Sequence, residues 1–297
     1  MQLIKKHAAL LRIAAAVIVL LGSLSFLVLR FEVVSRLAVR LDGNSARIPI
    51  LMYHHFADDD SSPGTVISAE MFESHIKALS DAGYTAISFE ELFDYVYHGA
   101  SLPERPLVIT IDDGYMSVFE TAYPILRKYD MKATVFIIGV LHGETLYKDT
   151  QYPVYPLHFG DAEALKMVES GTISIQSHSF DMHQNEPYET GPFRKGVLRM
   201  SGEGKEDYIE AFNADFERAA SQIENMVGVR PSVYSYPYGR HSKLSEKLLR
   251  DNGVKATVTI RKGISIVKRD SPESLFGLKR YNVRGDMTAE KLLALIR

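Results

Sequence analysis

The sequence predicts an α/β protein in which a barrel of about seven parallel strands follows one N-terminal transmembrane helix. Two patterns predict the barrel: short apolar strands alternate with amphipathic helices, and the strand candidates are numerous enough to close a sheet on itself. A long apolar run near the start predicts the membrane helix. The chain has 297 residues, so the part beyond that helix is long enough to bury a substantial core.

The start of the chain is typical of a membrane anchor. Two lysines and an arginine precede the uncharged run Ile13–Leu29, and Arg30 follows it. This run is near the lower limit for crossing a bilayer, but it is longer than most signal-peptide cores and has no polar face. We expect residues 1–40 to form a cytoplasmic tail, a signal-anchor helix and a linker. Residues 41–297 would then form a domain on the extracellular face of the cell membrane.

Composition excludes several classes of partner and linkage. Charged residues make up 24% of the chain and the net charge is −3, which gives no basic surface for nucleic acid. The chain has no cysteine, so disulfides and thiolate metal ligands are excluded. We therefore expect no nucleic-acid partner.

Strand and helix signals alternate through the domain in the order that a parallel sheet requires. Ile48–His54 begins the series, and the helix Ser68–Ala82 follows with Gly83 as its stop. Ser88–Glu91 is a capping box that opens a second helix. The further strand candidates are Thr85–Ile87, Leu107–Asp112, Thr134–Ile138, Thr172–Ser177, Ser232–Tyr236 and Lys255–Ile260. The further helix candidates are Phe119–Tyr129, Ala162–Glu169, Glu206–Met226 and Leu244–Asp251.

Reactive side chains follow four of the predicted strands. They are His54 and His55, Asp112 and Asp113, His178, and the segment Tyr236–Tyr238. The carboxyl ends of parallel strands meet at one edge of a sheet, and chemistry collects there in such folds. We therefore expect these side chains to lie close together.

The pair Asp112 and Asp113 ends a buried strand and precedes Gly114. Neighbours on a strand normally point to opposite faces, but a sharp turn at the glycine lets both carboxylates aim at one point. Two carboxylates so close repel each other unless a cation or a shared proton separates their roles. A cation site is therefore expected at this strand end.

His178 and His183 supply further ligands. Their spacing of five residues differs from the i, i+4 spacing of two ligands on one helix face, so we expect a strand end and a loop that curls around the ion. Two imidazoles and a carboxylate are a common catalytic zinc set that leaves a position open for water. The same set also suits Co, Ni or Fe.

These segments resemble the motifs of the NodB-homology polysaccharide deacetylases, carbohydrate esterase family four. Thr110–Gly114 is similar to the first motif, Thr-Phe-Asp-Asp-Gly; His178 to His183 resembles the second; Tyr236–Gly239 resembles the third; and Leu51–His55 looks like a common opening strand. The resemblance runs from Pro49 to Val283 and implies a deformed (β/α) barrel, with residues 41–297 as the deacetylase domain. The forms of the second and third motifs look most like the poly-N-acetylglucosamine deacetylase branch.

The resemblance also implies residue roles. Asp113, His178 and His183 would bind one divalent metal ion, with zinc expected first. Asp112 would act as general base, and the backbone N–H of Tyr238 would stabilise the oxyanion. The implied reaction is metal-dependent removal of acetyl groups from N-acetylated sugars.

The sequence departs from the family pattern in three places. Four residues instead of three separate the two histidines, Ser235 replaces the arginine that usually opens the third motif, and Gly277–Tyr281 occupies the region of the usual Leu-x-His motif. No residue is thereby assigned to orient Asp112. The general acid also stays unassigned: His54 is our first candidate for a site role and His241 the second, with a structural role as the alternative for both. Without a good acid, a modest catalyst is expected.

The expected substrate is an extracellular polymer of N-acetylglucosamine, with poly-β-1,6-N-acetylglucosamine as first choice. Peptidoglycan or chitin-like oligosaccharides are the alternative, and a catalytically weak glycan-binding module on the same fold is a third. The aromatic residues Tyr147, Tyr152, Tyr155 and Phe159 are expected either to stack on sugar rings or to pack at the barrel's edge. The expected partners are this glycan and the cell membrane.

Overall fold

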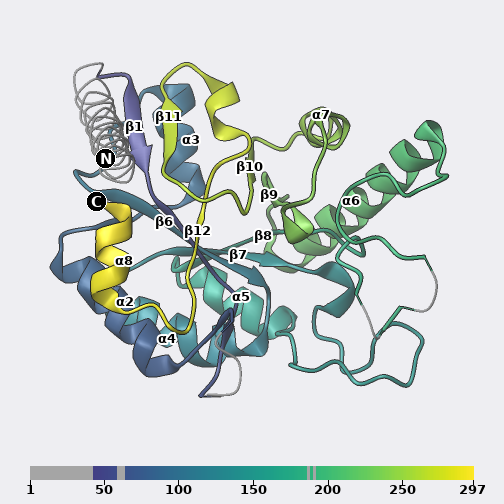
Figure 1. The fold of residues 1–297 in the computed structure, drawn as a ribbon, viewed down its shortest axis with the longest axis horizontal. Coiled ribbons are helices and arrows are strands. Elements are labelled where there is room, and N and C mark those ends of the chain that lie inside the picture. Colours follow the sequence, from purple (N-terminus) through teal and green to yellow (C-terminus); the bar gives the residue numbers. More distant parts are fainter. Residues whose placement is uncertain (1–42, 59–63, 186–187, 190–191) are drawn as a thin grey trace, which may run out of the picture. The chain divides into compact units, whose positions relative to one another are not determined.

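The computed structural model describes residues 43–58, 64–185, 188–189 and 192–297 (Figure 1). By its internal contacts the chain divides into Met1–Ala46 and Arg47–Arg297, and the second unit contains the helices and the central sheet described below. The predicted transmembrane helix lies outside the described residues. Among the residues that are described, no helix is both long enough and apolar enough to cross a bilayer.

A parallel sheet forms the centre of the unit. Seven of its strands follow the continuous order β10-β9-β8-β7-β6-β2-β12, and β5 pairs with β6 off this path. A single parallel bridge between Val258 and Leu278 links the edge strand β10 to the segment that leads into β12. The sheet is thus a half-barrel of parallel strands, as the strand–helix alternation predicts. Its strands are β2 (Ile50–Tyr53), β5 (Thr85–Ala86), β6 (Pro106–Asp113), β7 (Ala133–Ile137), β8 (Ile173–Ser177), β9 (Val233–Ser235), β10 (Ala256–Val258) and β12 (Tyr281–Asn282).

Helices cover the outside of the sheet, with α2, α4 and α5 along one side and α6 and α7 near β8 and β9 (Figure 1). Ser68 caps α2, and Ser88 with Glu91 forms the predicted capping box of α3. The described α-helices are α2 (Ala69–Asp81), α3 (Phe89–His98), α4 (Tyr123–Lys128), α5 (Asp161–Glu169), α6 (Lys205–Val227), α7 (Lys243–Asp251) and α8 (Ala289–Ile296).

The helix predicted over Phe119–Tyr129 is divided in the structure. A π-helical turn, Val118–Ala122, precedes α4. Pro124 explains the division, because it has no N–H to donate to the carbonyl four residues earlier. Further short elements were not predicted: β1 (Ser45–Ile48), β3 (His55–Phe56), β4 (Val66–Ile67), β11 (Ser265–Lys268), β12 and α8.

The alternation of side chains along β6 separates the apolar core from the site. Leu107, Ile109 and Ile111 belong to the hydrophobic cluster that packs against the surrounding helices. Thr110 and Asp112 are equally buried but lie on the other face, because successive strand residues point to opposite sides. Their face is the interior of the half-barrel, and there a polar side chain needs a partner. The period of the strand therefore places Asp112 inside the barrel.

Candidate metal centre

The chain turns sharply at the end of β6. Asp113 has a φ of 75° and Gly114 a φ of 83°, both in the left-handed region. A Cβ atom at Gly114 would lie 2.9 Å from Cγ2 of Ile137, so only glycine fits there. The predicted turn thus begins one residue early, at Asp113 itself. An aspartate held in this conformation is strained, and such strain concentrates at functional sites.

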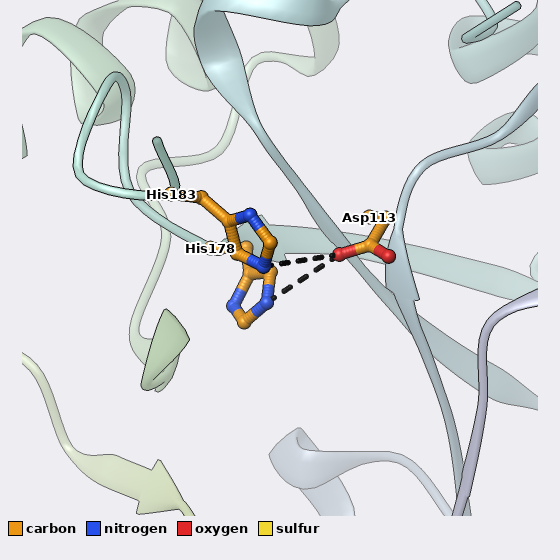
Figure 2. A group of neighbouring side chains, drawn as sticks. All are labelled: Asp113, His178 and His183. Atoms are coloured by element: carbon orange, nitrogen blue, oxygen red, sulfur yellow. Dashed lines mark ion pairs between the residues drawn. The ribbon is translucent and has the colours of Figure 1, made fainter. Parts of the chain in front are cut away.

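Asp113, His178 and His183 come together at this turn (Figure 2). The Oδ1 atom of Asp113 lies 3.6 Å from Nε2 of His178 and 3.7 Å from Nε2 of His183. One ligand atom from each of the three residues lies within 4.8 Å of the others. Oδ1 of Asp113 is buried and has no hydrogen-bond partner among the described residues. A divalent cation would satisfy this oxygen, so the three residues fit a metal ion.

The protonation of His178 also fits a ligand. Its Nδ1 lies 2.7 Å from the carbonyl oxygen of Ser235. Because a carbonyl can only accept, Nδ1 must donate, which leaves the lone pair on Nε2 facing Asp113. Burial lowers the pKa of His178 to about 4, so the ring is neutral at neutral pH, as metal binding requires.

Tyr238 packs beside the second histidine. Its ring centroid lies 4.1 Å from that of His183, and its hydroxyl donates to the carbonyl of Gln184 at 3.1 Å. Tyr238 has a φ of 56°, so it shares the left-handed conformation of Asp113. The three motif segments therefore meet at one place.

Asp112 has a partner that the sequence reasoning missed. The guanidinium of Arg280 donates to both its carboxylate oxygens, at 2.7 and 2.8 Å, and the hydroxyl of Ser235 donates to Oδ2 at 3.2 Å. Arg280 is fully buried, and its Nε also donates to the carbonyl of Thr259. Arg280 thus orients Asp112 where the third motif has Ser235 in place of arginine. The missing arginine itself was the signal: a buried carboxylate without it needs a cation from elsewhere.

The charge of Arg280 determines the state of Asp112. Burial alone would raise the pKa of this carboxyl, but the charge and hydrogen bonds of Arg280 outweigh burial and hold the pKa well below its usual value. The carboxylate is therefore ionised at neutral pH. Oδ1 accepts one hydrogen bond from the described residues and Oδ2 two, and Oδ2 lies 4.0 Å from Nε2 of His178.

Histidines from the first strand region complete the surroundings. Burial raises the pKa of both Asp112 and Asp113, and His54 is among the charges that lower it; the buried Nδ1 of His54 has no partner among the described residues. His55 instead binds the hydroxyl of Ser117 at 2.8 Å. His54 and His55 are thus both within electrostatic range of the aspartates, and His55 is held by Ser117.

Comparison with known proteins agrees with this geometry. A family model described as polysaccharide deacetylase matches residues 99–257. YxkH of Bacillus subtilis, described as a polysaccharide deacetylase, is 28% identical over 84% of this chain and 76% of its own length. A poly-β-1,6-N-acetyl-D-glucosamine N-deacetylase of Staphylococcus aureus is 25% identical, over 64% of this chain and 59% of that enzyme.

The fold has a solved counterpart. A de-N-acetylase from Aggregatibacter actinomycetemcomitans superposes with a TM-score of 0.71 at 22% identity, covering 84% of this chain and all of the other. At this identity the likeness concerns the fold alone. The family match extends over more than half of the sequence and includes all three motif segments. This chain therefore belongs to the polysaccharide deacetylase family of de-N-acetylating hydrolases.

Proposed function

We propose that this protein removes acetyl groups from an N-acetylated glycan with one divalent metal ion held by Asp113, His178 and His183. The observation that supports this most strongly is the buried Oδ1 of Asp113, which has no hydrogen-bond partner among the described residues and faces two imidazole Nε2 atoms. Zinc is the expected ion, and Co, Ni or Fe would suit the same three ligands.

Asp112 is the general base in this proposal. When bound, the metal ion would polarise the acetyl carbonyl and lower the pKa of a water molecule. Asp112 accepts a proton from the attacking water, because Arg280 holds its carboxylate ionised and in one orientation.

Proton donation and charge stabilisation fall to two further residues. His54 donates a proton to the sugar nitrogen as the carbon–nitrogen bond breaks, so that the products are acetate and a free amine. The backbone N–H of Tyr238 stabilises the negative charge that develops on the carbonyl oxygen. The support for these roles is that the charge of His54 is among the influences that lower the pKa of both aspartates against the effect of burial, and that Tyr238 packs on His183.

Three exposed apolar side chains in the segment 152–157, which we call the strip, favour a polymeric substrate. Tyr155 is 84% exposed, Tyr152 49% and Leu157 46%. The strip adjoins the site, because the carbonyl of Leu157 accepts from the N–H of Met116 at 2.7 Å, three residues beyond Asp113. The apolar faces of sugar rings pack on such side chains, so the strip would hold units of the chain next to the reacting one. Tyr147 and Phe159, from the same predicted set, are buried and serve packing instead.

Poly-β-1,6-N-acetylglucosamine is the proposed substrate. Two observations support this choice: the forms of the second and third motifs, and the activity after which the Staphylococcus aureus relative is named. We further propose that residues 1–40 anchor the domain on the extracellular face of the cell membrane. This part of the proposal rests on the uncharged run Ile13–Leu29 and on the extracellular location of such a polymer.

The test is acetate release by the full-length protein in mild detergent. Metal is first removed and then resupplied, and the glycans compared are β-1,6-linked N-acetylglucosamine oligomers, chitin oligomers and peptidoglycan. We expect metal-dependent release, fastest from the β-1,6 oligomers. Release from another glycan alone would change the substrate assignment. Glycan binding without any acetate from the metal-loaded protein would contradict the enzymatic role and indicate a binding module.

A further inference from the structure

In the loop between the two metal histidines, three carbonyls accept from backbone N–H groups, those of Gly139, Val140 and Gly196, but the N–H groups of the loop have no backbone partner among the described residues. The four residues of this loop, 179–182, use their N–H groups for side chains: Ser179 donates to Oγ of Ser177, and Met182 donates to Oγ of Ser179. Phe180 and Asp181 donate to Oδ2 and Oδ1 of Asp215, at 3.0 and 2.7 Å. The carboxylate of Asp215, distant in sequence, thus accepts from both N–H groups in the middle of the loop.

Asp215 belongs to a face of α6 that contacts this loop at two positions and the neighbouring Gly139 at a third. Three residues further along the helix, the guanidinium carbon of Arg218 lies 3.9 Å from the centroid of the Phe180 ring. Seven residues along, the amide of Gln222 donates to the carbonyl of Gly139 at 3.1 Å. Residues spaced by three and seven positions share one face of a helix. The N–H of Gly139 in turn donates to the carbonyl of Ser179. The same face of α6 therefore contacts the loop directly and also through Gly139.

The packing at this contact leaves no room for adjustment. A Cβ atom at Gly139 would lie 2.6 Å from both the Phe180 ring and Oε1 of Gln222. The side chain of Asp181 points elsewhere and pairs with Lys148 at 2.8 Å. The backbone of the loop is therefore fixed by α6, while the side chain of Asp181 is held by Lys148.

The partial burial of the Asp215 carboxylate lowers the stability of the folded protein. The residue is half-buried, and burial raises the pKa of its carboxyl to about 6 although two N–H groups donate to it. A dehydrated carboxylate reduces stability at neutral pH. A serine or amide would cap one N–H at lower cost, whereas a carboxylate accepts from both neighbouring N–H groups at once.

We propose that Asp215 is a positioning residue for the metal site, which fixes the loop so that His178 and His183 present their Nε2 atoms to one ion before that ion binds. The inference rests on the metal site proposed above. It also gives a reason for the fourth residue between the histidines, because the two N–H groups in the middle of the longer loop are those that Asp215 accepts.

The test compares two carboxylate-to-amide changes on the same helix in the full-length protein. Asp215→Asn replaces one acceptor oxygen by a donor that faces a backbone N–H. We expect it to weaken Zn²⁺ binding about 10- to 100-fold, measured by competition with a chromogenic chelator. Glu217→Gln is the matched control, because Glu217 pairs with Arg230 and Ser221 and should leave the Zn²⁺ affinity unchanged. Amide exchange in the metal-free protein should accelerate in residues 178–183 only for Asp215→Asn.

Two further measurements keep the outcome decisive. Asp215→Glu keeps the charge but shifts the carboxylate by one methylene, so it replaces Asp215→Asn if that variant does not fold, and a smaller loss in affinity is expected. In the unchanged metal-free protein, the amides of Phe180 and Asp181 should already exchange slowly. Fast exchange there, or a folded Asp215 variant within twofold of the original Zn²⁺ affinity, would overturn the role of Asp215. An unchanged protein that binds no Zn²⁺ would instead overturn the metal site itself.

Discussion

Asp112 and Asp113 are neighbours in sequence and both are buried, yet their surroundings differ in kind. Asp112 faces a permanent cation, Arg280, which donates to both its oxygens. Asp113 faces imidazoles, and its Oδ1 has no hydrogen-bond partner among the described residues. A buried charge needs a counter-charge: the protein supplies one for Asp112, and in our proposal a bound metal ion supplies the one for Asp113.

Asp112→Asn should have the largest effect on rate. The change preserves the shape of the side chain but removes the base, so kcat for acetate release should fall by about 10²- to 10⁴-fold. Zn²⁺ affinity should stay within a few-fold, because Asp112 is not a ligand. The measurement is acetate release and chelator competition on one preparation. A rate near that of the unchanged protein would contradict the division of roles between the two aspartates.

Arg280→Ala should have the largest effect on stability. It leaves Asp112 buried without its cation, which costs about 3–5 kcal/mol in the free energy of unfolding. Arg230→Ala is the control, since Arg230 forms an exposed pair with Glu217 and its loss should cost about 0–1 kcal/mol. Urea unfolding of the metal-free proteins gives both values. Equal losses of unfolding free energy in the two variants would mean that the buried pair of Arg280 and Asp112 does not stabilise this part of the site.

Acid should destabilise the folded protein through a further buried histidine, His158. Burial lowers the pKa of His158, which packs against Tyr115, to about 4 from its ordinary 6.5. A lowered histidine pKa means that the unfolded chain binds the proton more readily. The stability from the neutral ring is therefore complete above pH 6.5 and is lost as the pH falls toward 4, by up to about 3 kcal/mol.

His158→Gln should flatten this part of the pH dependence. The free energy of unfolding of the metal-free protein at pH 7 and pH 4.5 is the measurement, and the exposed His98→Gln is the control. An identical pH dependence in the unchanged protein and in His158→Gln would show that His158 is not held neutral by burial.

Tyr155→Ala should have the smallest effect, outside both aspartate surroundings. The Michaelis constant should rise several-fold for long glycans and stay the same for a single N-acetylglucosamine unit, because only a chain reaches the strip. Tyr97→Ala is the control: it removes an exposed tyrosine of α3, and the Michaelis constants for long and short substrates should both stay the same. Equal Michaelis constants for long and short substrates in the unchanged protein and in Tyr155→Ala would remove the strip from the binding site.

Much of the fold followed from the sequence because its signals are local. The capping box at Ser88, the apolar run before Asp112 and the glycine after Asp113 each act within a few residues. The three side chains of the metal site could be paired because each follows a strand of one parallel sheet. That inference needed only the rule that such strand ends share an edge.

Arg280 and β12 could not be found in that way. A strand of two residues has no period to detect, and its pairing with β2 joins segments at opposite ends of the domain. The ion pair between Arg280 and Asp112 spans 168 residues, and nothing near either residue indicates the other. Asp215 was missed for the same reason, because its partners are backbone N–H groups of a distant loop.

Metal stoichiometry in two neighbouring variants tests the central claim most directly. The full-length protein, Asp112→Asn and Asp113→Asn are each freed of metal, incubated with Zn²⁺, desalted and analysed for bound metal. The account predicts one Zn²⁺ per chain in the unchanged protein and in Asp112→Asn, and a large loss in Asp113→Asn. Equal Zn²⁺ in both variants, or none in the unchanged protein, would contradict it.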